Sequence, residues 1–350
     1  MEFCLKSTLG FRFLLFRRLV NQTWKERFKA NLCSTVQSSE GAKEEQNINI
    51  EQLFLDQRVQ SILEKVTGLD MAKIFRPHKC PLSTPRYQFL TDKQLQDLMD
   101  DAKKRAKEKL QMPPVMKERE PITTVISYDP EIQGYTDCKY VFTDITYGIS
   151  DRLLCHISIQ KRIIVTRHPD GKLCHSSWEE RHWMNQIYFP VPERTLEMPK
   201  MFEEEHLQKV LDRQEYEFVL DRACLQCDPD DPIYIRVTQT TYRHIDEMKK
   251  YDDLRSTRHF GPMVFYFAMN KQIDNLLLFL IQKNRLEDAV EIIKLYYIIH
   301  PRLEKFPEDD YINYIQNYIE FDAKKKNNLQ LALQTYVELY HHVLKDKNAM

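Results

Sequence analysis

The chain has 350 residues, of which 42% are hydrophobic and 11% aromatic, so it has enough apolar material for a core larger than that of one average domain. Its 51 basic and 52 acidic residues nearly cancel, and its seven glycines are too widely spaced for the glycine-rich loops that bind phosphate. The longest apolar runs, at 263–269 and 276–281, fall well short of the ~18 residues that a membrane-spanning helix needs, which argues against a membrane protein.

Residues 1–35 differ in composition from the rest of the chain. They contain seven basic and two acidic residues, and apolar side chains such as Phe16 and Trp24 lie between the arginines. This composition is typical of a mitochondrial presequence, because a secretory signal would need ~7–15 uninterrupted apolar residues. We therefore expect residues 1–35 to direct the protein to the mitochondrial matrix; the alternative is a basic helix that lies on a membrane or on RNA. Residues 36–56 are expected to be a flexible lead-in.

The charge of the remaining chain bears on its partners. Without the seven basic and two acidic residues of 1–35, it holds 44 basic and 50 acidic residues, a net charge of −6. Nucleic-acid affinity depends mainly on clustered Lys and Arg, which release counterions from phosphate. The acidic body therefore favours protein partners, with RNA contacted only through local patches.

Residues 57–121 are predicted to form an N-terminal helical segment. A first helix is expected over 51–66, with apolar residues at helical spacing and Gly68 as its stop. Thr91 is predicted to cap a second helix, which Pro113 and Pro114 terminate. The apolar residues of this second helix fall on one stripe: Leu95, Leu98, Met99, Ala102, Ala106 and Leu110.

The second helix is acidic in its first half and basic in its second. The candidate site residues are its five basic residues, Lys103, Lys104, Arg105, Lys107 and Lys109. They span nearly two turns, so they cannot share one face, but Lys103 and Lys107 lie on one outward strip. Two interpretations remain open: a surface helix whose charges suit the helix dipole, and a basic end that contacts RNA phosphate.

Residues 122–240 are predicted to be a mixed α/β region. The alternating, β-branched and aromatic pattern at 140–147 predicts a strand, and further strands are expected at 161–167, 172–175 and 233–238. Asp170 and Gly171 supply a hairpin turn, which makes a small antiparallel sheet the natural inference. A capping box formed by Ser177 and Glu180 opens a helix to about residue 189, and 203–226 are expected to be helical.

Residues 241–350 are predicted to form a C-terminal helical region. Three apolar stripes, beginning at Leu286, Tyr311 and Leu329, are joined by short polar segments, which indicates antiparallel helices packed on one another. Because no repeat of fixed period is found, a tetratricopeptide-like array is only the second choice. The predicted fold class is α+β, predominantly α, with a small antiparallel sheet in the middle of the chain and an antiparallel helical C-terminal region.

Only one spacing suggests metal or redox chemistry, the pair Cys224 and Cys227. A zinc site would need a second close pair of ligands, and a redox pair normally opens a helix, whereas this pair is expected to close one. We therefore expect buried cysteines at a helix end. Asp228, Asp230 and Asp231 could chelate a cation, but the prolines among them favour a solvated turn. Because no catalytic motif occurs, the sequence predicts no catalytic residues, no metal, no cofactor and no small-molecule substrate.

Several segments together resemble one known family. They are Val59–Leu63 with Thr67–Leu69, Met112–Val115, Lys139–Ile145, Ser177–Arg181 with Tyr188–Pro190, Tyr251–Arg258 with Met263–Phe267 and, more weakly, Leu331–Tyr336. In this order, over roughly residues 57–300, the chain resembles the mitochondrial small ribosomal subunit protein twenty-two family. The resemblance implies a non-catalytic protein held among other proteins of the mitochondrial small ribosomal subunit, with limited rRNA contact. Residues 153–160 depart from the family pattern and are either an inserted loop or an error in the gene model.

A second class of function stays open at this stage. It is a matrix RNA-processing or enzymatic factor whose C-terminal half is a helical repeat. Such a factor would sediment apart from small ribosomal subunits, whereas a structural ribosomal protein would travel with them. The resemblance, the acidic body and the missing motifs favour the ribosomal function.

Overall fold

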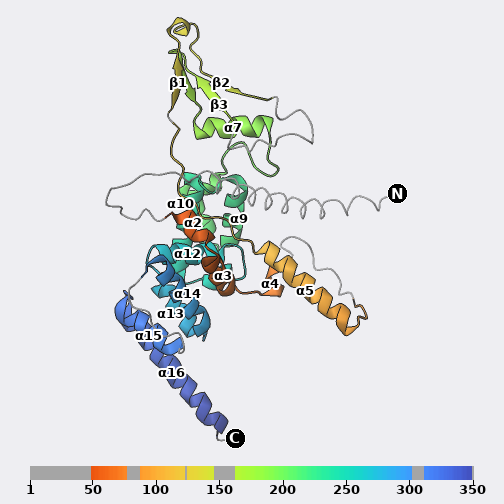
Figure 1. Ribbon diagram of the computed structural model, residues 1–350, viewed down its shortest axis with the longest axis vertical. Helices are drawn as coiled ribbons and strands as arrows, with labels where there is room; N and C mark the ends of the chain where they lie inside the picture. Colours follow the sequence, from red (N-terminus) through yellow and green to blue (C-terminus); the bar gives the residue numbers. More distant parts are fainter. Residues whose placement is uncertain (1–48, 77–86, 123, 146–161, 302–310, 349–350) are drawn as a thin grey trace. The chain divides into compact units, whose positions relative to one another are not determined.

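A computed structural model of the protein describes residues 49–76, 87–122, 124–145, 162–301 and 311–348 (Figure 1). The predicted presequence (1–35), most of the lead-in and the departing segment 153–160 lie outside the described residues. In the described parts the fold class is confirmed: helices predominate, and one small antiparallel sheet lies in the middle of the chain. No helix among these parts is both long and apolar enough to cross a bilayer.

The N-terminal helices are α2 (Ile50–Leu55), α3 (Gln57–Thr67), α4 (Met71–Ile74) and α5 (Asp92–Lys109). The single helix predicted over 51–66 is thus two helices. They divide at Asp56, which ends α2 and caps α3 by accepting a hydrogen bond from the Arg58 N–H at 2.9 Å. The lead-in predicted over 36–56 also extends too far toward the C-terminus, because residues 50–55 are helical and Phe54 is buried in the core.

The sheet contains β1 (Val125–Tyr128), β2 (Tyr140–Thr143), β3 (Ile164–Arg167) and β4 (Lys172–His175), in the order β1-β4-β3-β2. All neighbouring strands are antiparallel, and the short turn helix η1 (Pro130–Ile132) follows β1. The strands predicted at 140–147 and 161–167 are shorter than expected within the described residues, and β1 was not predicted. The hairpin at Asp170 and Gly171 is confirmed, since the Gly171 N–H donates to the His168 carbonyl at 3.1 Å.

Helix α7 (Trp178–Tyr188) lies against the sheet (Figure 1). Its predicted capping box is present: the Ser177 hydroxyl accepts from the Glu180 N–H, and the Glu180 carboxylate accepts from the Ser177 N–H. The same carboxylate accepts a hydrogen bond from the Thr166 hydroxyl at 2.9 Å and pairs with Lys139. One side chain therefore both starts the helix and fastens it to β3.

Helices make up the chain after α7: η3 (Lys200–Phe202), α8 (Glu204–Leu211), α9 (Tyr216–Gln226), α10 (Pro232–Met248), α11 (Tyr251–Leu254), α12 (Phe260–Met269), α13 (Asp274–Gln282), α14 (Leu286–Ile299), α15 (Tyr311–Phe321) and α16 (Lys326–Asn348). A continuous apolar core joins them to α2 and α3. Within it α3 packs on α12 and α14, and α13 packs on α16. The three predicted C-terminal stripes lie on α14, α15 and α16, as expected.

The strand predicted at 233–238 is wrong, because these residues lie in α10. Asp231 caps this helix by accepting from the Ile233 N–H at 2.9 Å, and Pro232 occupies the first helical position, where proline is favoured. The β-branched residues are compatible with a helix because Thr238 donates its hydroxyl to the Tyr234 carbonyl at 2.9 Å.

Candidate functional site

Helix α5, which carries the candidate site residues, is built by local signals in the sequence. Thr91 and Gln94 form a capping box at its start, so the predicted cap at Thr91 is confirmed. Near its other end Ala106 is fully buried, and α4 is the neighbouring element. The rest of the helix is largely exposed, including Leu95 (49% exposed), Leu98 (46%) and Met99 (47%). Sequence reasoning found the stripe but not its exposure.

The structure does not bring the five predicted basic residues together. Lys103 pairs with Asp100 at 3.3 Å on the exposed surface, and the Arg105 guanidinium donates to the Asp101 carbonyl of its own helix at 3.3 Å. Lys109 faces α4, where its ammonium donates to the Ile74 carbonyl at 3.4 Å and lies 4.3 Å from the centre of the Phe75 ring.

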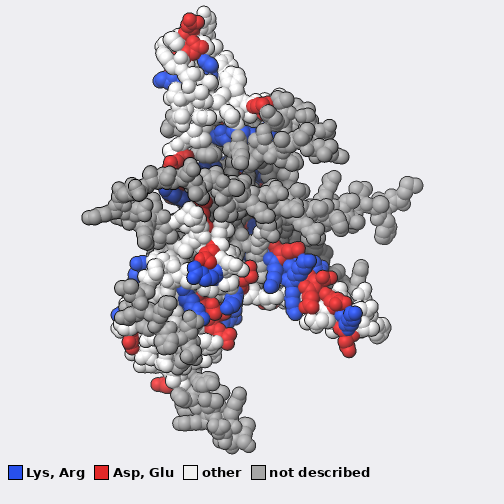
Figure 2. Space-filling model, in the orientation of Figure 1, with Lys and Arg blue, Asp and Glu red and all other residues white. Residues whose placement is uncertain are grey.

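Lys104 and Lys107 are exposed and form no ion pair with any described residue. By helix geometry they lie on the side of α5 away from the apolar stripe, with Lys103 beside them. Acidic and basic patches alternate along α5 (Figure 2). The candidate site therefore reduces to Lys103, Lys104 and Lys107, a strip that is open to an anionic partner.

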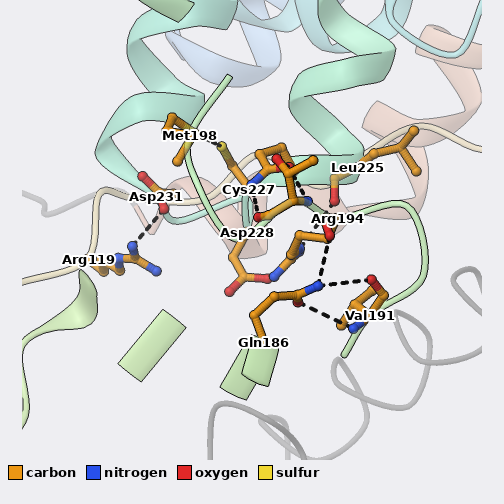
Figure 3. Close-up of polar contacts among 11 residues, drawn as sticks. Arg119, Gln186, Val191, Arg194, Met198, Leu225, Cys227, Asp228 and Asp231 are labelled. Carbon is orange, nitrogen blue, oxygen red and sulfur yellow. Dashed lines mark hydrogen bonds and ion pairs between the residues drawn. The ribbon is translucent and has the colours of Figure 1, made fainter. Parts of the chain in front are cut away.

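The second candidate, Cys224 and Cys227, is a pair of free thiols at the end of α9, of which Cys227 is shown in Figure 3. Cys227 is buried and lies 3.9 Å from the Met198 sulfur, whereas the Cys224 thiol lies 3.6 Å from the Tyr234 hydroxyl. Burial raises the pKa of both thiols, that of Cys227 to about 12, which favours their protonated form at neutral pH. The prediction of buried helix-end cysteines is confirmed for Cys227.

Two of the three aspartates that follow, Asp228 and Asp231, are held by arginines rather than solvated, so the predicted solvated turn is wrong. Arg119 pairs with Asp231 at 2.7 Å, and Arg194 pairs with Asp228 at 3.3 Å (Figure 3). Each of these four side chains is less than one fifth exposed. The arginines lie 112 and 34 residues from their partners in the sequence, so spacing could not reveal the pairs. Among the described residues no group of His, Cys, Asp or Glu could hold a metal ion.

The turn also connects α7 with α9. Gln186 of α7 donates to the Arg194 carbonyl at 2.8 Å, and the Arg194 guanidinium donates to the Leu225 carbonyl at 3.2 Å (Figure 3). Arg119 adds a backbone hydrogen bond to the Asp230 carbonyl at 3.0 Å. These ion pairs and hydrogen bonds join separate chain segments, so their arrangement is that of a clamp, although Arg119 Nε and Asp230 Oδ1 are buried without a hydrogen-bond partner among the described residues.

The segment Tyr251–Arg258, which carries part of the resemblance, likewise holds the core together. Arg255 pairs with Asp288 of α14 at 2.9 Å, while Arg258 pairs with Asp221 of α9. Asp221 also lies 3.0 Å from the ring of buried His259. Burial opposes the ionisation of Asp221, but the His259 hydrogen bond and the Arg258 charge outweigh it and lower the pKa of Asp221 well below its usual range.

Comparison with known proteins agrees with this scaffold-like arrangement. A family model described as mitochondrial 28S ribosomal protein S22 matches residues 52–301. The small ribosomal subunit protein mS22 of Bos taurus is 41% identical over 292 residues, which are 82% of this chain and 79% of the relative. The protein of the same name from Mus musculus is 40% identical over 291 residues, with the same shares of both chains.

These matches place the chain among the ribosomal proteins of mitochondria. Within that class the chain belongs to the mitochondrial ribosomal protein S22 family. The matched range begins in α2 and ends after α14, so it contains both helix α5 and the Arg194–Asp228 clamp.

Proposed function

We propose that the protein is a structural constituent of the mitochondrial small ribosomal subunit and supports subunit assembly without catalysis. Membership of the S22 family carries the proposal, since the family match includes the helical core from α3 to α14. The geometry supports it: the buried polar groups around Asp221 and Arg194 serve the fold, while α5 leaves its charged and apolar faces exposed. The site of action is then the mitochondrial matrix.

Sedimentation of mitochondrial extracts tests this function. A tagged full chain should travel with small subunits through a salt wash, and its depletion should lower small-subunit abundance and mitochondrial translation together. A matrix protein known to be soluble is the control for trapping in the gradient. A chain that stays at the top of the gradient, or whose loss spares subunit abundance but impairs rRNA processing, would point instead to the RNA-processing or enzymatic factor.

Within this function, the strip of Lys103, Lys104 and Lys107 is our proposed contact to rRNA phosphate. Its support is the exposure of these side chains and, for Lys104 and Lys107, the absence of an ion pair with described residues. Each phosphate that a lysine neutralises adds to the salt dependence of binding. Replacing all three by Glu should therefore lower the fraction retained on small subunits, most clearly as salt is raised.

The matched control is Lys93→Glu, which changes one exposed lysine at the other end of the same helix. It should leave retention within error of wild type. If the triple variant stays bound like wild type at every salt concentration, the strip is an ordinary solvated helix surface and the other contacts of the chain must account for its retention.

A further inference from the structure

The first half of α5 exposes an apolar surface that the described residues leave uncovered. Leu95, Leu98 and Met99 occupy successive positions of the stripe and are each nearly half exposed. Tyr87, Phe89 and Leu90, directly before the helix, are exposed as well. An amphipathic helix normally buries such a stripe, and contiguous exposed apolar groups are typical of an interaction surface.

We infer that this half of α5 is a docking surface for a basic amphipathic helix of another protein, which runs antiparallel to α5. The inference rests on the proposed function in one respect, namely where in the cell the partner protein is expected. It concerns a different face and a different class of partner from the lysine strip.

Charge around the stripe determines the chemistry of the partner. Asp92 lies near one edge of this stripe and Asp101 near the other, whereas Asp97 and Asp100 lie on the opposite side of α5. Neither Asp92 nor Asp101 forms an ion pair with a described residue. A partner helix with Lys or Arg beside its apolar stripe would complement both features, as flanking charges do in coiled coils. Phosphate would be repelled, so this face does not suit rRNA.

The orientation follows from the dipoles of the two helices. Basic residues favour the last turns of a helix, where the partial charge is negative. A neighbour that docks on the stripe and runs antiparallel to α5 places those basic last turns near Asp92 and Asp101. A parallel neighbour would bring its own first turns, which are usually acidic, against the same aspartates.

A second copy of this chain fits the surface less well. The basic residues of α5 lie in its second half, but there the stripe is already covered: Ala106 is fully buried and Lys109 contacts Ile74 and Phe75. If two copies of α5 packed antiparallel, the exposed apolar stripe in the first half of one helix would face the covered stripe in the second half of the other. A separate helix with its own free stripe avoids this mismatch.

Photo-crosslinking from inside the helix tests the inference. The full chain, carrying benzoylphenylalanine in place of Leu98, is expressed in cells and irradiated in intact mitochondria. The matched control carries the same probe in place of Lys104, on the opposite side of α5. We expect Leu98 to give a ribonuclease-resistant adduct with another protein, whose crosslinked peptide is a basic amphipathic segment, and Lys104 not to give that adduct.

An adduct with RNA, with a second copy or with another part of the same chain overturns the inference, and so does the lack of any adduct. The readout is independent of the proposed function. If the chain sediments away from small subunits, the proposed ribosomal function is wrong. A protein adduct from Leu98 in the fractions that contain the chain still supports the docking surface. The absence of a protein adduct from those fractions still overturns the docking surface.

A substitution pair gives a second measurement. Leu95→Ser with Leu98→Ser should reduce recovery of the crosslinked protein by about tenfold when the probe replaces Met99, without changing the unfolding midpoint, because neither leucine is buried. Leu331→Ser with Leu339→Ser, two exposed leucines of α16, is the control and should leave recovery unchanged. Unchanged recovery in the α5 variant overturns the inference.

Discussion

At the scale of single residues, Asp221 is the group on which the packing of α9 against the Tyr251–Arg258 segment depends most. Replacing it by Asn leaves Arg258 and His259 without their charged partner. Breaking a buried pair from one side costs about 3–5 kcal/mol, and since Asp221 is 31% exposed we expect on the order of 2–3 kcal/mol. Urea unfolding of the purified chain measures this loss.

The control for Asp221→Asn is Asp252→Asn. Asp252 pairs with Lys283 and with Arg285, in each case at 3.6 Å, but its side chain is 46% exposed, so the loss should stay below about 1 kcal/mol. Equal losses in the two variants would show that the Asp221 cluster contributes no more than a surface pair.

His259 makes stability depend on pH. Burial lowers the pKa of this histidine, so the folded protein binds its proton less readily than the unfolded chain does. The stabilisation is therefore present above the unfolded pKa of about 6.5 and is lost as pH falls below it, by at most about 1.4 kcal/mol per pH unit. Unfolding free energies at pH 7.5 and 5.5 should differ more in wild type than in His259→Gln. A variant with the wild-type slope would assign the dependence to other groups, such as half-buried His182, whose pKa burial also lowers.

At the scale of elements, the sheet depends on the close approach of two turns. Gly171 has φ +86°, and a Cβ there would overlap the backbone carbonyl oxygen of Asp129. Gly171→Ala should therefore strain the β1–β4 pairing and destabilise the sheet by about 1–3 kcal/mol, seen as faster amide exchange at Leu173. Gly134→Ala is the comparison: its φ is +83°, but no atom lies within 4 Å of the added Cβ. Similar exchange in the two variants would contradict the overlap.

The elements also show which parts of the fold the sequence can predict. The cap at Ser177 was predicted from the glutamate three positions later, and the cap at Thr91 from its place before an apolar stripe. The strand at 233–238 was wrong because β-branched composition was given more weight than the Asp231-Pro232 helix start. For the candidate site, sequence located the lysines and the stripe of α5. Its exposure depends on what packs against the helix, and no local pattern encodes that.

At the scale of the whole molecule, the strongest prediction from sequence concerns delivery to mitochondria. Residues 1–35 carry seven basic and two acidic residues, so replacing Arg12, Arg17 and Arg18 by Glu should keep a fluorescent fusion of the full chain outside mitochondria. Lys103→Glu, Lys104→Glu and Lys107→Glu together change the same number of charges outside this segment and should be imported normally. Normal import of the arginine variant would contradict the prediction that residues 1–35 act as a presequence.

The packing of α3 also constrains the order in which the chain can fold. Its buried side chains Val59, Leu63 and Val66 contact α12 and α14, and the Thr67 carbonyl accepts from the Ser256 N–H, 189 residues further along. Synthesis proceeds from the N-terminus, so α3 is made long before any of these partners exists. Contacts so distant in sequence form slowly, and the apolar face of α3 stays open to chaperones and to aggregation until α14 has been made. Helix α3 is therefore one of the first helices to be synthesised and among the last to pack on its partners.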